Sequence, residues 1–540
     1  MKTAEREAGA VAFEACAARR VAWRTSGHLA IPPTRTCPRP AWADSLNCLG
    51  KNNEWARMSQ SQVHSGGNDA LARLDAIAQA DLVRSGQISA SELVEAAIAR
   101  IEATNPALNA VTHKLYAQAR KRAASPALSG SLAGVPFLIK DVLSVAGTPN
   151  TFGCRALAGF IPPTSSPYAL ALEAVGLVTV GRTNTPEFAL IDATEPKLFG
   201  ATHNPWDLTR SPGGSSGGAG AAVAAGMTPI AHASDGGGSI RHPACHNGVF
   251  GLKPSRGRNR SDGAPPMPFD LPDVAVNHVL TRSVRDSALM LSLTEDPDTK
   301  LGPLGFVRDP ISKPLRVGLI QEGFSGNRAA TDVDDALVST ARLCESLGHH
   351  VEPTAWPFSG PAAIEAFLDA WMVLAASAVQ ATCAWIGCDA DTEHFEPWTL
   401  GLASRGAALS PERIAGAVAE LTQASRALDA FFEAYDVLLS PVARHPAKLL
   451  GEHATDLPFD TLFERAVDDS DFTPLINAAG IPAMSIPLYW SANNLPIGSH
   501  FAARAGAEAT LFGLAYQLEA ARPWADRWPP ASYQEVAQVA

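Results

Sequence analysis

Residues 211–241 read SPGGSSGGAGAAVAAGMTPIAHASDGGGSIR, and this stretch decides the fold. Two glycine-rich serine patches flank small, helix-forming residues at 219–225 and a short apolar segment. An isolated GGSSGG is typical of a flexible linker. A linker would not run directly into a helix former, nor end in GGGS immediately before Ile240 and Arg241. The stretch therefore predicts an ordered loop, helix, strand and second loop.

The second patch has the composition of an anion-binding turn. Gly236, Gly237 and Gly238 allow the backbone to bend so that successive N–H groups point into one concavity. If the hydroxyl of Ser239 attacks a carbonyl, the resulting oxyanion falls into that concavity. Each backbone donor would then stabilise the transition state by about 2.7 to 4 kcal/mol.

A serine hydroxyl is a weak nucleophile at neutral pH and needs a base beside it. Lys140 is a candidate because it ends the apolar segment 134–142, GVPFLIKDV. Burial favours the neutral amine and lowers the pKa of a lysine by up to several units. The competing interpretation is a surface lysine paired with Asp141. The segment alone leaves both open.

Outside this stretch, helical and strand patterns alternate along the chain. Leu71, Leu74 and Ile77 predict one helix that stops at Gly86, and a Ser89–Glu92 capping box predicts a second that ends at Asn105–Pro106. A further helix is expected to end with residues 170–174, and three others to span 329–347, 362–384 and 411–435. Strands are expected at 134–142, 177–180, 315–319, 437–439 and 484–488. This alternation predicts an α/β layer architecture in one large domain.

Six segments together resemble the amidase signature family. They are GVPFLIKD (134–141), TNTPEF (183–188), ATHNPWD (201–207), SPGGSSGG (211–218), SDGGGSIRHPA (234–244) and GVFGLKPSRGR (248–258). The resemblance covers essentially residues 71–530. It implies a single large α/β/α domain around a mixed, mainly parallel twisted sheet.

The same resemblance implies a Ser-cisSer-Lys triad and an acyl-enzyme. Lys140 matches the family's lysine, Ser215 the serine behind a cis peptide bond, and Ser239 the nucleophile. The backbone of Gly236, Gly237, Gly238 and Ser239 would form the oxyanion hole, with Ser216, Asp235 and Arg241 in support. The implied reaction is hydrolysis of the carbon–nitrogen bond of a small linear or cyclic carboxamide, without metal or cofactor.

Two alternative functions compete with this interpretation. Residues 213–217 match G-x-S-x-G, the nucleophile elbow of α/β-hydrolase esterases, with His445, His453 and His500 as candidate bases. The elbow needs a strand directly before it, whereas 204–212 holds two prolines and no apolar run. Within the family, a glutamine-hydrolysing amidotransferase subunit stays open.

Substrate-contacting residues are harder to predict, because no motif marks a pocket wall. TEPKLFGATHNPWD (194–207) and LEAARPWADRWPP (518–530) resemble bacterial 6-aminohexanoate-cyclic-dimer hydrolases and related amidases. The candidate residues for an apolar pocket wall are Phe367, Trp371, Phe431, Phe472 and Leu475. His242 and Cys245 are expected to pack in the core. The alternative for Cys245 is that its thiol contacts the substrate.

Composition restricts partners and location. A net charge of −11 without a long Lys/Arg run disfavours nucleic acid and anionic membranes as partners. The eight cysteines include no CxxC pair, and no uninterrupted apolar run reaches membrane-spanning length, which predicts a soluble cytoplasmic enzyme with reduced thiols. A small-molecule amide is the expected partner, and a homodimer stays open.

The first 57 residues differ from the rest of the chain. They hold nine Lys or Arg against five acids, a net charge of +4, with a proline-rich patch and no clear periodicity. We expect residues 1–57 to be a disordered leader, with Met58 as the true start, and residues 58–540 to form the catalytic domain.

Overall fold

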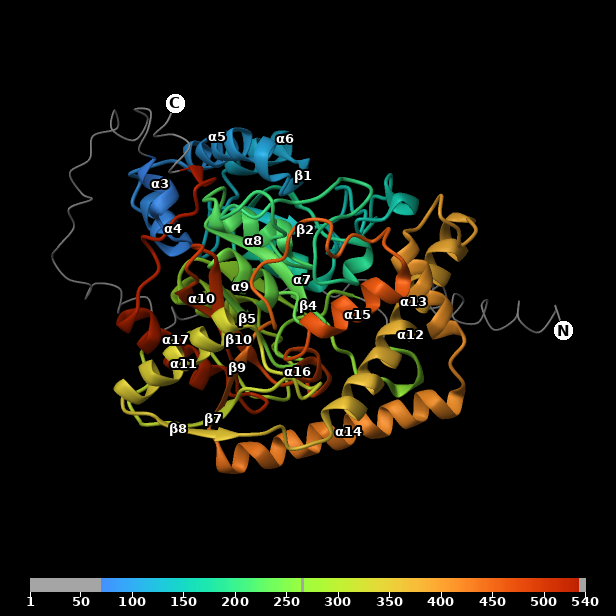
Figure 1. The fold of residues 1–540 in the computed structure, drawn as a ribbon. Coiled ribbons are helices and arrows are strands. Elements are labelled where there is room, and N and C mark those ends of the chain that lie inside the picture. Colours follow the sequence, from blue (N-terminus) through green and yellow to red (C-terminus); the bar gives the residue numbers. More distant parts are fainter. Residues whose placement is uncertain (1–68, 264–266, 534–540) are drawn as a thin grey trace, which may run out of the picture. The chain divides into compact units, whose positions relative to one another are not determined.

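The computed structural model describes residues 69–263 and 267–533, and the predicted leader lies outside these residues. An 11-stranded sheet runs through the described part in the order β1-β3-β2-β4-β6-β5-β10-β11-β9-β7-β8 (Figure 1). Its strands are β1 (Val111–Lys114), β2 (Pro136–Lys140), β3 (Val178–Thr183), β4 (Ile230–Asp235), β5 (Phe250–Lys253), β6 (Val276–Thr281), β7 (Arg316–Ile320), β8 (His350–Thr354), β9 (Val437–Pro441), β10 (Ala483–Trp490) and β11 (Pro496–Ala502).

The sheet is mixed, as predicted, but the expected excess of parallel pairs is wrong. Strands β3, β2 and β4 pair in parallel, as do β8, β7 and β9, whereas the six other pairings among the described strands are antiparallel. The parallel pairs β2/β3 and β7/β8 are joined by helices α7 (Pro167–Ala174) and α11 (Thr331–Ser346), because a parallel pair needs a crossover connection. The two parallel groups therefore flank an antiparallel centre.

Helices cover both faces of the sheet, so the predicted α/β/α layering is confirmed. Along β2, Leu138 packs on one face with α5 (Ala90–Leu108) and α8 (Gly217–Ala224). Phe137 and Ile139 pack on the other face with α4 (Ala76–Arg84), α7 and α10 (Val284–Thr294). This alternation follows from the two-residue period of a strand. Lys140 ends the same strand.

The remaining helices pack against the sheet or against one another. They are α9 (Arg241–Asn247), α12 (Gly360–Ile386), α13 (Pro397–Ala407), α14 (Pro411–Ala434), α15 (Phe459–Asp469), α16 (Pro474–Ala478) and α17 (Glu508–Ala521), with α6 (Tyr116–Ala123) beside α5. The helices predicted over 329–347, 362–384 and 411–435, and all five predicted strands, are confirmed within a few residues.

Two helix boundaries near the N-terminal side differ from prediction. The first predicted helix is divided into α3 (Ala70–Arg73) and α4, because the Asp75 side chain accepts the Ala78 N–H and starts a new helix. Helix α5 passes Pro106 and ends at Leu108. A proline in the last turn removes one hydrogen bond only. Asn105 Oδ1 then accepts the N–H groups of Ala110 and Val111 and fixes the chain just after the helix.

Helix α12 is the one helix in the described part of the chain that is long and apolar enough to cross a membrane by length and composition. Half of its most apolar window is buried inside the fold, where it packs against α13 and α14 (Figure 1). Its side chains Phe367 and Trp371 also line the cavity described below. These two packing surfaces explain its apolar composition.

Candidate active site

Lys140 is the last residue of β2 and is completely buried. Its Nζ lies 2.7 Å from Ser215 Oγ and 3.0 Å from Ser234 Oγ. Burial lowers the pKa of Lys140 to about 7, and the charge of Asp235 only partly opposes this shift. Asp141 instead pairs with Arg182, at 3.4 Å, so the interpretation of Lys140 as a surface lysine is wrong.

Ser215 follows a cis peptide bond from Gly214 and lies just before α8. Gly214 has no room for a side chain, because a Cβ would lie 2.6 Å from the backbone of Ala193. The neighbouring Ser216 Oγ donates to Ser234 O at 3.2 Å. This bond fixes Ser216 to β4. Ser216 therefore supports Ser215 indirectly, through Ser234, which also contacts Lys140.

The glycine loop after β4 is organised around the Asp235 carboxylate. Oδ1 accepts the Gly238 N–H at 2.7 Å, and Oδ2 accepts the Ile240 N–H at 3.1 Å. Gly238 N–H is therefore committed to Asp235, which contradicts its predicted place among the oxyanion donors. The N–H groups of Gly236, Gly237 and Ser239 make no hydrogen bond within the described residues.

The peptide between Gly237 and Gly238 is held on both sides. Its N–H binds Asp235, and its carbonyl oxygen accepts from Thr473 Oγ1 at 2.6 Å. Thr473 Oγ1 in turn lies 3.1 Å from His242 Nε2. A Cβ at Gly238, which has φ of 133°, would lie 2.4 Å from Thr473 Oγ1. These contacts fix the orientation of the loop that presents Ser239.

Arg241 and Asn477 complete the support of Asp235. Arg241 Nε and Nη2 each lie 2.9 Å from the carboxylate, and Asn477 Nδ2 lies 2.8 Å from Oδ1. Burial alone would raise the pKa of Asp235, but the buried Arg241 guanidinium holds it well below its usual range. Asp235 and Arg241 thus lie where the sequence predicted them, as a buried brace.

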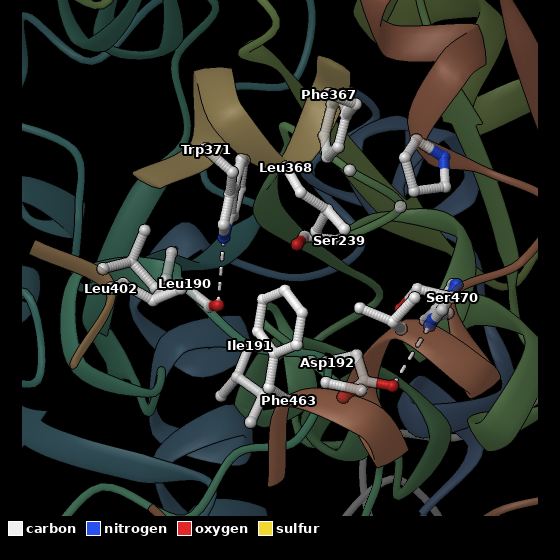
Figure 2. Close-up of a pocket in the computed structure, with 18 of the residues that line it drawn as sticks. Leu190, Ile191, Asp192, Ser239, Phe367, Leu368, Trp371, Leu402, Phe463 and Ser470 are labelled. Atoms are coloured by element: carbon white, nitrogen blue, oxygen red, sulfur yellow. Dashed lines mark hydrogen bonds and ion pairs between the residues drawn. The ribbon is translucent and has the colours of Figure 1, made fainter. Parts of the chain in front are cut away.

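Ser239 lies at the edge of a cavity of about 650 Å³, counted with its opening to solvent. The Ser239 hydroxyl has no hydrogen-bond partner in the described parts of the chain, and 9% of the residue is exposed. Figure 2 shows Phe367, Leu368 and Trp371 on one side of Ser239, and Ile191 and Phe463 on the other. The cavity is thus walled by apolar side chains from α12 and α15.

An ionic cluster lies beside this cavity. Lys448 Nζ contacts the carboxylates of Asp192, at 2.6 Å, and Asp469, and His453 Nδ1 lies 2.8 Å from Asp192 Oδ1. Asp192, His242 and Asp469 could by their spacing hold a metal ion. The Lys448 ammonium already contacts both carboxylates, so this side chain supplies the positive charge that a metal ion would bring.

The structure corrects several predicted contacts. Of the five candidate wall residues, Phe367 and Trp371 line the cavity, whereas Phe431, Phe472 and Leu475 are buried elsewhere in the core. His242, predicted to be a packing residue, also lines the cavity. Cys245 does not line it, because its Sγ is buried and accepts the Gly498 N–H at 3.1 Å.

Sequence reasoning missed Ser234, Thr473 and Asn477. Ser234 directly precedes Asp235 and was the only one of the three with a local signal, its place inside SDGGGS. The other two come from a distant part of the chain. No feature of residues 473–477 distinguishes them from an ordinary buried turn.

The geometry does not support a nucleophile elbow at Ser215. Residues 205–212 contain no strand, and the partner of Ser215 Oγ is Lys140. His445 contacts Asp468, His453 contacts Asp192, and His500 contacts Arg241 and Ser440. None of the three histidines hydrogen-bonds Ser215 within the described residues.

Comparison with known proteins agrees with this geometry. The family model described as Amidase matches residues 92–512. AmiC of Mycobacterium leprae, which is named as an amidase, is 39% identical over 86% of this chain and 98% of its own length. The 6-aminohexanoate-cyclic-dimer hydrolase of a Pseudomonas species is 36% identical over 84% of this chain and 96% of its own.

Solved structures give the same result. A 6-aminohexanoate cyclic dimer hydrolase complexed with substrate superposes with a TM-score of 0.79 at 33% identity, covering 85% of this chain and 99% of that one. A bacterial aryl acylamidase of the amidase signature family gives 0.75 at 28% identity, over 86% and 98%. This chain therefore belongs to the amidase family, whose members hydrolyse carbon–nitrogen bonds of amides other than peptide bonds.

Proposed function

We propose that this chain hydrolyses a small carboxamide through a Ser-cisSer-Lys triad of Ser239, Ser215 and Lys140. The observation that carries the proposal is the contact of 2.7 Å between Lys140 Nζ and Ser215 Oγ in a completely buried setting. A pKa lowered to about 7 leaves much of Lys140 uncharged at neutral pH. An uncharged amine has the lone pair that a general base requires.

The reaction follows as a proton relay. Neutral Lys140 accepts the Ser215 proton, and Ser215 accepts the Ser239 proton as Ser239 Oγ attacks the amide carbon. The C–N bond breaks when the proton returns through Ser215 to the departing nitrogen, which leaves an acyl-enzyme on Ser239. Water then repeats the sequence and releases the acid. The relay requires Ser239 Oγ to turn toward Ser215 Oγ, a hydrogen bond that the described residues do not contain.

The oxyanion of each tetrahedral intermediate would be bound by the loop before Ser239. The N–H groups of Gly236, Gly237 and Ser239 are the loop donors that have no partner among the described residues. Gly238 contributes differently, because its N–H holds the loop on Asp235. Removal of one such donor typically costs about 10²- to 10³-fold in kcat.

The test is a comparison of Ser239→Ala, Ser215→Ala and Lys140→Ala with the wild-type enzyme on a panel of aliphatic, aryl and cyclic amides. Each variant should lose nearly all turnover, and a fluorophosphonate probe should label wild-type protein but not Ser239→Ala. Amide turnover that survives Ser239→Ala would refute the mechanism. The homodimer and the cytoplasmic location remain predictions.

A further inference from the structure

We infer that the cavity selects amides whose bound group is uncharged and apolar, preferably aromatic, and that it rejects charged amides such as glutamine. This inference rests on the proposed function, because it names the substrates of the same site. Its evidence is the chemistry of the cavity wall, which plays no part in the proton relay.

The wall offers apolar contact over most of its area. Phe367, Leu368 and Trp371 come from α12, Trp398 and Leu402 from α13, and Phe463 from α15. Phe367 and Trp371 stack with ring centroids 5.7 Å apart. Aromatic walls of this kind gain free energy mainly from apolar surface and ring contacts of the ligand.

The two tryptophans present no free hydrogen-bond donor. Trp371 Nε1 and Trp398 Nε1 both donate to the carbonyl oxygen of Leu190, each at 3.2 Å. Figure 2 shows the Trp371 bond and Leu190 beside it. Because one carbonyl holds both indoles, their orientation is fixed and their N–H groups are occupied. A ligand therefore meets the carbon faces and edges of the rings.

Asp192 is the only charged side chain among the described residues that line the cavity. Its Oδ2 contacts Lys448 Nζ and its Oδ1 contacts His453 Nδ1, at 2.6 and 2.8 Å. Both oxygens thus already have partners, and Lys448 occupies the position that a substrate ammonium would take. Among the described residues, no lysine or arginine lines the cavity to bind a carboxylate.

These features separate the chain from a glutamine hydrolase. Glutamine carries an ammonium and a carboxylate, and both would lose water on entering the cavity without gaining a partner. Burial of an unpaired charge is strongly unfavourable. An uncharged group of the same size loses much less hydration free energy on entering the cavity, and it gains apolar contact.

The experiment compares three amides of one shape: 3-phenylpropanamide, its para-carboxylate and its para-aminomethyl derivative, with glutamine as a fourth. For the wild-type enzyme, kcat/KM for the uncharged amide should exceed that for each charged compound by at least about 100-fold. The uncharged amide should also protect Ser239 from a fluorophosphonate probe at concentrations where the charged amides do not.

A matched pair of variants tests the wall itself. Phe463→Lys places a cation in the cavity, and Glu464→Gln makes the same change in net charge one residue away, on the exposed side of α15. Phe463→Lys should raise kcat/KM for the para-carboxylate relative to the uncharged amide by about fivefold, the effect of a partly exposed ion pair. Glu464→Gln should leave this ratio unchanged.

The outcomes distinguish this inference from the proposed function. Similar kcat/KM for all three amides, or a preference for the para-aminomethyl compound, would overturn the substrate class. Loss of turnover in Ser239→Ala would still support the mechanism in that case. An unchanged ratio in Phe463→Lys would overturn the role of this wall. Absence of both amide turnover and Ser239 labelling would overturn the proposed function and the inference with it.

Discussion

Two buried lysines near the active site have opposite electrostatic properties. Lys140 contacts two hydroxyls, and burial lowers its pKa to about 7. Lys448 contacts the carboxylates of Asp192 and Asp469, which raise its pKa above the ordinary value although burial acts in the opposite direction.

The difference shows that burial alone does not decide the charge of a lysine. The partners within hydrogen-bonding distance decide it: hydroxyls leave the cost of desolvation in place, whereas carboxylates more than offset it. One buried amine is thereby available as a base, and the other is fixed as a structural cation. The following predictions test this division of roles.

The largest effect is expected from Lys140→Met. The substitution removes the base from the relay, so kcat should fall by at least about 10³-fold. The melting temperature should stay near or above that of the wild type, because a desolvated amine without a carboxylate partner is replaced by an apolar side chain. Steady-state kinetics and calorimetry measure the two effects. Substantial remaining activity would contradict the role of Lys140.

Lys448→Met should mainly reduce stability. It leaves two buried carboxylates without their cation, which should lower the free energy of unfolding by about 3 to 5 kcal/mol in urea titrations. The matched control is Lys253→Met, since Lys253 is a buried lysine whose one side-chain hydrogen bond within the described residues goes to the carbonyl of Pro254. A larger loss in the control than in Lys448→Met would contradict the structural role of the Lys448 cluster.

Thr473→Val should separate loop orientation from substrate binding. The change removes the hydroxyl that holds the Gly237 carbonyl, so kcat should fall about 10- to 100-fold while KM changes little. Thr340→Val is a control that removes a buried hydroxyl bond between α11 and Ser499 of β11. Equal losses of kcat in both variants would show a general packing effect instead.

Activity should depend on pH through Lys140. The pKa of Lys140 is lowered to about 7 and its neutral form is the base, so kcat/KM should rise with pH to a plateau above 7. Below 7 it should fall about tenfold per pH unit as the ammonium forms. The pH profile of an uncharged amide substrate measures this. A profile that is flat from pH 5.5 to 8 would exclude a base with this pKa.

The smallest effect is expected at Cys245. Its thiol is buried against the backbone of Gly498 and does not line the cavity, so Cys245→Ala should change kcat/KM by no more than about twofold. Treatment with a thiol-blocking reagent gives a second measurement. Inactivation that is prevented by bound amide would place the thiol in the substrate site after all.

The residues of the proposed triad could be predicted because the motifs that hold them resemble those of the amidase signature family. Local sequence alone left the role of Lys140 open, and the structure brings Ser215 Oγ to within 2.7 Å of its Nζ at the end of β2. The commitment of Gly238 N–H to Asp235 was missed, because a carboxylate three residues earlier competes for the same donor and sequence does not show which acceptor is nearer.

The pocket wall and the strand directions depend on long-range packing. Phe367 and Phe431 have the same character in sequence, and only tertiary structure places one in the cavity wall and the other in a core cluster with Ile320 and Leu438. Apolar strands likewise carry no record of whether a neighbour runs parallel or antiparallel. The expected excess of parallel pairs failed in the centre of the sheet for this reason.

The apolar composition of α12 has a consequence for biosynthesis. During translation this helix leaves the ribosome before α13, α14 and α15, which cover it or share the cavity with it. Until those helices are made, the apolar residues of this 27-residue helix lack the packing partners that bury them in the complete fold. Exposed apolar surface of this kind favours aggregation and chaperone binding in incomplete chains, so the helix that walls the cavity is also a liability during synthesis.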